Sequence, residues 1–323
     1  MIRTRALLIR LITPLLLASV VSCNRVGPVA CNKGTDSMSV ARRAEHLASF
    51  DHVWQTINDR HYDPTFGGLD WNAVRIDLRP KMERVATDAE AEAVLSDLVH
   101  RLKLSHFGIL APGQPARAQL EGPEAFVPAL AKETPVAKVK FGNLPELPLR
   151  VTSRRLPSSV GYFYLGIFLE PSKVMPKYRQ AVNDARELDG LIIDLRHNPG
   201  GLGAMATGMA NALIDKPGLK LGTMIQREGD LNFVLNPQAD PYTKPVAVLI
   251  DGQSGSTSEI FAQGMQDAGR ARIFGTRSAG QALPSYLETL PNGYLFQYAI
   301  ANYTSASGKT LEGNGVTPDE IVE

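Results

Sequence analysis

The chain alternates apolar and polar positions at helical spacing over its first folded stretch. Within 41–60, apolar side chains recur three or four positions apart, as on the buried face of an α-helix. A break containing a proline and two glycines follows, and a second helix is expected to start near Asp70. A third helix is expected from Thr87, because Glu90 three residues later completes a capping-box pattern. Residues 40–107 therefore predict a small helical domain.

The pattern changes twice beyond that domain. Residues 108–158 contain eight prolines and only short strand-like runs, which predicts an irregular connection with two or three edge strands and no room for a complete PDZ domain. Over 159–323, apolar runs of strand length alternate with helical segments, which predicts an α/β layered core. The expected strands are 161–168, 190–195, 219–225, 246–251, 271–274 and 294–301, and the expected helices are 173–187, 202–214 and 258–268.

Composition narrows the function classes. The 323 residues are 44% hydrophobic, enough for a buried core, and carry a formal net charge of +1. The near-equal numbers of acidic and basic residues argue against nucleic-acid binding as the main function. Two cysteines exclude a disulfide-dense scaffold. The Cys, His, Asp and Glu residues show no metal-ligand spacing, so no metal or organic cofactor is expected.

Residues 1–22 have the pattern of an export signal and are separate from the fold. Three arginines precede an apolar run of about 11 residues, well short of the roughly 20 that span a bilayer. Small residues then precede Cys23, as in bacterial lipoprotein signals. We therefore expect cleavage before Cys23, lipidation of that cysteine, a polar tether over 23–39, and a protein anchored to a membrane and facing the periplasm or cell exterior. An ordinary signal peptide with a chance cysteine is the alternative.

Candidate chemistry first occurs at the strand-to-helix turn 194–201. A buried strand ends there in Gly200 and Gly201, and a helix follows. Glycines let a ligand approach the main chain, and unpaired N–H groups can stabilise a developing negative charge. A plain connecting turn is the alternative.

A second turn of this kind, 251–259, is rich in serine. It places Ser254, Ser256 and Ser258 around an expected helix start, where the helix dipole favours an oxygen anion. Serines also cap helices, and for each serine taken alone capping is the simpler explanation.

A nucleophilic serine needs a base, and the chain has six histidines. Four of them lie in the helical domain, where surface or packing roles are expected. His197 follows the first turn and is expected to face solvent. His106 follows Ser105 at the point where the third helix gives way to a loop.

Four segments in this order resemble the tail-specific (C-terminal processing) serine protease family, and more closely its tricorn-protease branch. The N-terminal helices also match, so the resemblance spans 40–323. It implies a crotonase/ClpP-like ββα spiral core behind a small helical domain. It also implies a serine endopeptidase that acts on unfolded or peptide substrates. The four segments are Asp194–Gly201, Ser256–Ala262, Asp267–Ala271 and Glu312–Asp319.

The resemblance also implies roles for individual residues. Ser256 matches the nucleophile, and His106 matches the base of the tricorn branch. Ser105 and Glu312 match the groups that polarise and orient this histidine. These roles agree with the chemistry. A serine alcohol needs a base whose pKa lies near neutral pH, and the histidine needs a partner that fixes its tautomer.

The resemblance also implies an oxyanion hole, and the chain differs from one branch of the family at one position. The N–H of Thr257, with that of Gly200 or Gly201, matches the oxyanion-hole donors. In the processing-protease branch a lysine lies 25 residues after the serine, whereas this chain has Gln281 there. This departure favours the histidine mechanism over a serine–lysine pair.

Two other functions stay open on the sequence. One is a catalytically inactive binding protein on the same scaffold, since related folds bind apolar ligands. The other is an acyl hydrolase or esterase that uses the same serine. The expected partners are a polypeptide substrate and a membrane reached through the N-terminal lipid. No nucleic acid is expected, and the resemblance leaves a homo-oligomer open.

Overall fold

A computed structural model describes residues 38–112, 128–132, 135–140 and 146–322 of the protein. The first elements are three helices and a short 3-10 turn. Each helix starts at a side-chain cap: Ser39, Asp70 and Thr87 each accept a hydrogen bond from the main-chain N–H three residues on. The structure thus confirms a helical N-terminal region. Its elements are α1 (Val40–Arg60), η1 (Phe66–Gly68), α2 (Trp71–Glu83) and α3 (Asp88–His100).

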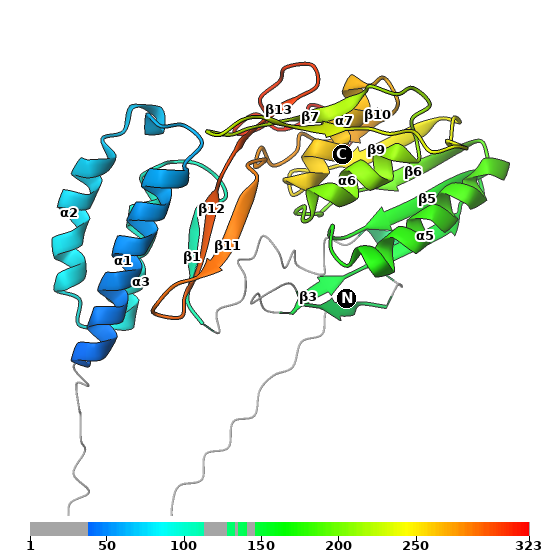
Figure 1. Ribbon diagram of the computed structural model, residues 1–323. Helices are drawn as coiled ribbons and strands as arrows, with labels where there is room; N and C mark the ends of the chain where they lie inside the picture. Colours follow the sequence, from blue (N-terminus) through cyan, green and yellow to red (C-terminus); the bar gives the residue numbers. More distant parts are fainter. Residues whose placement is uncertain (1–37, 113–127, 133–134, 141–145, 323) are drawn as a thin grey trace, which may run out of the picture. The chain divides into compact units, whose positions relative to one another are not determined.

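A six-stranded sheet organises the second half of the chain (Figure 1). Five of its strands are parallel, and β4, which comes from the proline-rich connection, pairs antiparallel at the edge. The apolar runs of its inner parallel strands, at 160–165, 190–194 and 246–250, suit a sheet covered on both faces. In spatial order the strands are β14 (Glu320–Ile321), β10 (Arg272–Gly275), β9 (Val246–Ile250), β6 (Gly190–Asp194), β5 (Val160–Leu165) and β4 (Val151–Arg155).

Helices follow the parallel strands along the chain, and a smaller sheet covers helix α7. Residues Thr257–Met265 of α7 are all buried. Phe261 of α7 shares one apolar cluster with Val248 of β9 and Leu221 of β7, so α7 is packed on both sides. The helices are α5 (Pro171–Asp184) with η3 (Ala185–Glu187), α6 (Gly203–Asn211) and α7 (Thr257–Asp267). The smaller sheet has the order β13 (Asn302–Ser305), β7 (Lys220–Ile225) and β8 (Leu231–Val234).

A third sheet joins the helical domain to the rest of the molecule. Its central strand β12 contributes Phe296 and Tyr298 to the same apolar cluster as Phe50 of α1 and Leu95 of α3. The order is β1 (Gly108–Leu110), β12 (Leu295–Ala299) and β11 (Ser285–Thr289); the remaining elements are the hairpin β2 (Ala137–Val139) and β3 (Leu147–Leu149) and the short helix α4 (Ala129–Lys132).

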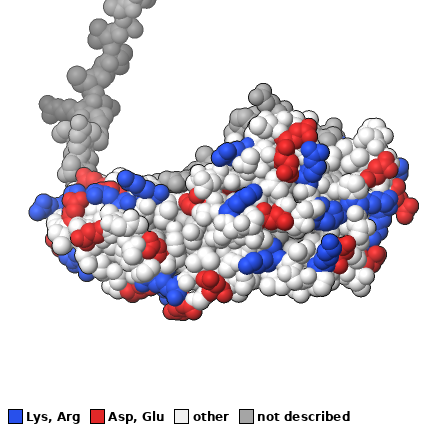
Figure 2. Space-filling view, turned by 90° about the horizontal axis from the view of Figure 1, so that it is seen from above, with Lys and Arg blue, Asp and Glu red and all other residues white. Residues whose placement is uncertain are grey.

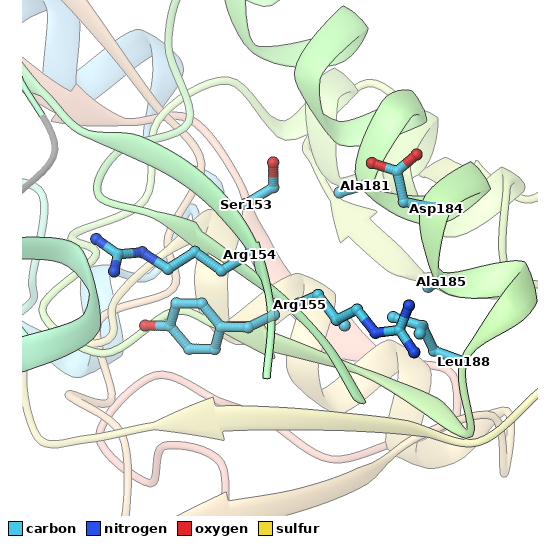
Figure 3. Close-up of a pocket in the computed structure, with 9 residues that line it drawn as sticks. Ser153, Arg154, Arg155, Ala181, Asp184, Ala185 and Leu188 are labelled. Atoms are coloured by element: carbon cyan, nitrogen blue, oxygen red, sulfur yellow. The ribbon is translucent and has the colours of Figure 1, made fainter. Parts of the chain in front are cut away.

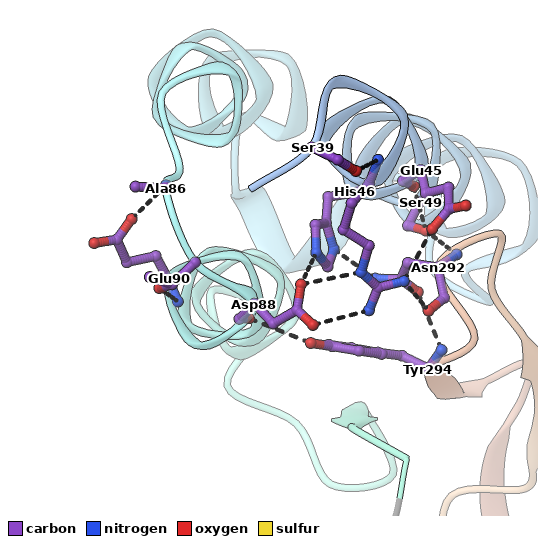
Figure 4. Close-up of polar contacts among 11 residues, drawn as sticks. Ser39, Glu45, His46, Ser49, Ala86, Asp88, Glu90, Asn292 and Tyr294 are labelled. Atoms are coloured by element: carbon purple, nitrogen blue, oxygen red, sulfur yellow. Dashed lines mark hydrogen bonds and ion pairs between the residues drawn. The ribbon is translucent and has the colours of Figure 1, made fainter. Parts of the chain in front are cut away.

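A partly buried polar cluster reinforces this junction (Figure 4). His46 of α1 is fully buried, and its Nε2 lies 2.7 Å from Asp88 Oδ1 of α3. Its Nδ1 lies 3.0 Å from the side-chain nitrogen of Asn292, in the turn between β11 and β12. The Asn292 N–H donates to Ser49 Oγ at 3.0 Å. Arg42 binds both the Asn292 carbonyl and Asp88. Two helices and the β11–β12 turn are thus joined by hydrogen bonds as well as by apolar contact.

Four strands were not expected from the sequence: β8, β11, β13 and β14. β8 and β11 carry exposed or half-buried side chains, β13 has the polar sequence Asn-Tyr-Thr-Ser with only its second and fourth side chains buried, and β14 is only two residues long, so no apolar run marks them. Among the described helices, none combines the length and apolarity needed to cross a bilayer. On the face shown in Figure 2, acidic and basic side chains are interspersed, in keeping with the near-zero net charge.

Replacing Asn292 by Ala should destabilise the protein. The change leaves the buried Nδ1 of His46 and the N–H of Tyr294 without their partner, and each buried group left unpaired costs about 1–3 kcal/mol. We expect a loss of about 2–4 kcal/mol in the free energy of unfolding, measured by urea denaturation. The exposed Asn236→Ala is the control and should stay within about 0.5 kcal/mol of wild type. Equal stabilities for the two variants would contradict this account of the junction.

Candidate active site

Ser256 occupies the N-cap position of α7 and differs from the two serines beside it. Its side chain is half-buried, and its backbone has φ of 52° and ψ of −115°, an uncommon conformation for a residue with a Cβ. Ser254 and Ser258 are fully buried, and their hydroxyls donate to the carbonyls of Leu195 and Asn198, each within 2.9 Å. Those two serines therefore brace the turn, and Ser256 is the one that reaches solvent.

The carboxylate of Glu259 holds the main chain around Ser256 in place. It is fully buried and accepts the Ser256 N–H at 2.9 Å. It also accepts the Ser278 hydroxyl at 2.6 Å and the N–H groups of Gly280 and Gln281 at 2.7 and 2.9 Å. Burial raises the pKa of Glu259, and these four hydrogen bonds oppose that rise. The segment 278–281 is thereby fastened to the start of α7.

The glycine turn after β6 lies directly against Ser256. A Cβ built on Gly200, which has φ of 105°, would lie 2.7 Å from the Ser256 Cβ and 2.8 Å from the Thr257 nitrogen. Only glycine can occupy this position without moving the serine. The buried side chain of Asn198 shapes the turn, because its amide donates to the Leu165 carbonyl at 2.8 Å and its oxygen accepts the Gly200 N–H at 2.9 Å.

These contacts separate the two glycines that the sequence left as alternatives. The Gly200 N–H is taken up by Asn198. Within the described residues, no acceptor is recorded for the N–H of Gly201 or for that of Thr257, the first residue of α7. The two residues are adjacent, since the Thr257 hydroxyl donates to the Gly201 carbonyl at 2.7 Å. The turn and the helix start therefore offer one unpaired N–H each beside Ser256.

Ser105, His106 and Glu312 form a hydrogen-bonded set. The carboxylate of Glu312 accepts both the N–H and the hydroxyl of Ser105, each at 2.8 Å. The Ser105 Oγ also lies 2.7 Å from the Nδ1 of His106. Because an ionised carboxylate only accepts, the Ser105 proton points to Glu312, and the Nδ1–H of neutral His106 must donate to Ser105. This leaves the Nε2 of His106 unprotonated and able to accept a proton.

One peptide unit links this set to the serine. The carbonyl of Gln281 accepts the Ser256 N–H at 2.8 Å, and the N–H of the same peptide, at Ala282, donates to Glu312 at 3.1 Å. Ser256 and Glu312 thus bind opposite edges of one rigid amide plane. The described contacts include no hydrogen bond between the Ser256 hydroxyl and the His106 ring. Such bonds are often long in the absence of substrate.

Burial lowers the pKa of His106 to about 4, so the ring is neutral at physiological pH. The residue also has φ of 59°, again an uncommon conformation for a side-chain-bearing residue. Backbone strain of this kind concentrates at functional sites, and here it occurs at both His106 and Ser256.

His197 has a different partner. Its Nε2 lies 3.1 Å from Asp251 Oδ2, and its N–H donates to the other oxygen of the same carboxylate at 3.0 Å. This holds the ring against the turn after β9, and contradicts the expectation of a simply solvent-facing histidine. A pocket of ≈ 150 Å³ between β4, β5 and α5, which includes Ser153, Arg155 and Asp184 in its lining, contains none of the predicted site residues (Figure 3).

Two contributions to the site were not predicted from the sequence. The role of Asn198 in occupying the Gly200 N–H has no signal in a single sequence. The use of the Gln281–Ala282 peptide has none either, because every residue carries that group. Cys23 and the rest of 1–37 lie outside the described residues, so the structure carries no information on the predicted export signal, lipidation and tether.

Comparisons with known proteins match the chain in two places. The peptidase family S41 matches residues 159–322, about half of the chain, and the tricorn protease C1 domain matches 42–100. A carboxy-terminal-processing protease of Bartonella bacilliformis is 32% identical over 186 residues, which are 55% of this chain and 42% of that protein. The chain therefore spans about two fifths of the length of two curated relatives and about a quarter of others.

Solved structures share the fold at low identity. The photosystem II D1 C-terminal processing protease superposes with a TM-score of 0.60 at 17% identity, covering 86% of this chain and 93% of that one. The tricorn protease superposes with a TM-score of 0.59 at 14% identity, covering 87% of this chain and 34% of that one. These likenesses confirm the predicted fold class, and the family match over half of the chain shows that the chain belongs to peptidase family S41.

Proposed function

We propose that the protein is a serine endopeptidase that hydrolyses unfolded or extended polypeptides, with Ser256 as nucleophile and His106 as general base. The observation that carries the proposal is the hydrogen-bonded set of Glu312, Ser105 and His106, whose geometry leaves Nε2 of the histidine ready to accept a proton. Membership of peptidase family S41 supports the reaction class.

In the first step the Ser256 Oγ attacks the carbonyl carbon of the scissile peptide while His106 Nε2 takes the serine proton. The new imidazolium donates from Nδ1 to Ser105, whose own proton is directed at the Glu312 carboxylate. Ser105 and Glu312 act here as positioning residues. The developing oxyanion is stabilised by the N–H groups of Thr257 and Gly201, each worth about 3–4 kcal/mol of barrier.

In the second step the tetrahedral intermediate collapses and the C–N bond breaks. His106 gives its proton to the departing amine, and an acyl-enzyme on Ser256 is left. Water then repeats the sequence: His106 removes its proton, the oxygen attacks the ester carbonyl, and Ser256 leaves with the proton returned from His106. No step needs Gln281 as a base, since only its main chain is engaged.

Ser256→Ala and His106→Ala should each abolish most of the proteolysis of an unfolded protein such as casein, with kcat/KM falling by about 10³-fold or more. A fluorophosphonate should label wild type and not Ser256→Ala. Ser258→Ala is the matched control, since it removes a buried bracing hydroxyl and keeps the nucleophile and its label.

Three results would count against the assignment. Absence of labelling in wild type would favour a binding protein on this scaffold. Fluorophosphonate labelling together with hydrolysis of esters but not of peptides would favour an acyl hydrolase. Full activity of His106→Ala with loss in Ser256→Ala would mean that another group is the base.

The rate should persist into mildly acidic solution. Because burial lowers the pKa of His106 to about 4, the acid limb of kcat/KM should fall below the value of about 6.5 for an exposed histidine. The lowered pKa also affects stability. As pH falls, His106 is protonated near pH 6.5 in the unfolded chain but only near pH 4 in the folded protein, so wild type should lose folding stability over that range. The His106→Gln variant lacks this titrating group and should lose less stability over the same range. The exposed His52→Gln is the control for both profiles. An acid limb at pH 7 or above would contradict this description.

We also propose that the protein is exported and anchored by a lipid on Cys23, on the strength of the sequence pattern in residues 1–23. In a bacterial host, wild type should incorporate radiolabelled palmitate and partition into the membrane fraction. Cys23→Ala should do neither, and Cys31→Ala should behave as wild type. Release of wild type into the soluble exported fraction without label would favour an ordinary signal peptide.

A further inference from the structure

The strand β1 begins two residues after His106 and lies at an edge of its sheet. In the order β1, β12, β11 it has one hydrogen-bonded neighbour, with Gly108 opposite Gln297 and Leu110 opposite Leu295. An edge strand presents a row of main-chain donors and acceptors that a further strand can use.

The register of the sheet determines which main-chain groups of β1 point outward. The Leu290 N–H donates to the Tyr294 carbonyl, and the Ile300 N–H donates to the Pro284 carbonyl. Hydrogen-bonded positions alternate in an antiparallel pair, so the even-numbered residues of β12 face β11 and the odd-numbered ones face β1.

It follows that Gly108 and Leu110 bond to β12, whereas the N–H and C=O of Ile109 point away from the sheet. Among the described residues, no partner is recorded for these two groups of Ile109. The main chain next to His106 therefore offers a donor and an acceptor in the geometry of a β-ladder.

Space beside β1 is open on the face that belongs to the catalytic core. Side chains alternate along a strand, and the two faces of β1 contact different clusters. Ile109 packs against the helical domain's cluster, whereas Leu110 packs against the cluster of the large sheet. Gly108 shares the face of Leu110, and a Cβ built on it meets nothing within 4 Å. A substrate side chain could occupy that space.

We propose that β1 binds the substrate of the proposed reaction as an added β-strand, paired through the N–H and C=O of Ile109, with Gly108 leaving room for a substrate side chain. The inference rests on the proposed function and names the class of ligand: an extended polypeptide with an unmodified main chain at the paired positions. Main-chain pairing tolerates many side chains but rejects proline, which lacks the donor.

The continuity of β1 with His106 favours a substrate over other occupants. A strand bound along β1 runs past the residue whose Nε2 is to act on the scissile peptide. Recognition through Ile109 would give extended, unfolded segments preference without a separate domain that grips their ends.

Binding can be tested separately from cleavage. In full-length Ser256→Ala, the probe is a fluorescein-labelled peptide from casein, with its affinity measured by fluorescence anisotropy. Methylating one main-chain nitrogen at a time should weaken binding about tenfold at the one position whose N–H donates to the Ile109 carbonyl and little at its neighbours, because only that methylation removes a hydrogen bond to β1. A uniform response along the peptide would overturn the proposal.

Variants of the strand complete the test. Ile109→Pro removes the outward N–H without touching a ladder bond, which an edge strand tolerates, and should weaken peptide binding about tenfold. Ile109→Ala keeps that N–H and loses only side-chain packing, so the difference between the two variants reports the hydrogen bond. Gly108→Val should weaken binding of peptides with bulky side chains more than that of a glycine-rich peptide, and it serves if Ile109→Pro does not fold.

The outcomes distinguish this inference from the proposed function. Sensitivity to methylation at a single position in Ser256→Ala, with no cleavage of the same peptide by wild type, would support strand addition and refute the peptidase. Cleavage by wild type, with affinity that responds neither to methylation nor to Ile109→Pro, would support the peptidase and refute strand addition.

Discussion

The buried carboxylate of Glu259 is the constraint on which the site depends. An ionised group without water is tolerated only when hydrogen bonds replace its hydration. Glu259 has four such bonds, from the main chain at Ser256, Gly280 and Gln281 and from the Ser278 hydroxyl. Each donor is fixed in direction by the need to satisfy that charge. The strained backbone of Ser256 is therefore held by an electrostatic requirement, since helix propensity alone does not favour its positive φ.

A second carboxylate, that of Glu312, holds two distant parts of the chain together by accepting hydrogen bonds from both. It binds Ser105 at the end of the helical domain and Ala282 in the segment that Glu259 secures. Apolar packing of α1 and α3 on β12 and the buried His46 cluster bring the two halves together over a broad surface. The large contact area supplies most of the free energy, and the few charged hydrogen bonds determine the alignment.

Much of this arrangement was predictable from local pattern. Caps at Asp70 and Thr87 mark helix starts, and the apolar runs at 190–195 and 246–251 mark buried strands ending in small-residue turns. The serine at the start of α7 follows from the same logic. What local pattern cannot reach is pairing across the chain. Ser105 and Glu312 are 207 residues apart, and only a resemblance between families indicated that they meet.

Two finer features could not be predicted from the sequence for a different reason. Gly200 and Gly201 are equivalent in the sequence, and the side chain of Asn198 is what makes their N–H groups differ. Strand β11 was missed because its side chains are mostly exposed, so its place in the sheet comes from its neighbour β12. In both cases the deciding partner is chosen by the tertiary fold.

The peptide between Gln281 and Ala282 has an evolutionary consequence. Its carbonyl accepts the Ser256 N–H and its N–H donates to Glu312, so the side chain of residue 281 is not needed for these structural contacts. Substitutions at position 281 can therefore change the chemistry that this side chain brings to the neighbourhood of Ser256 while the main-chain framework stays the same.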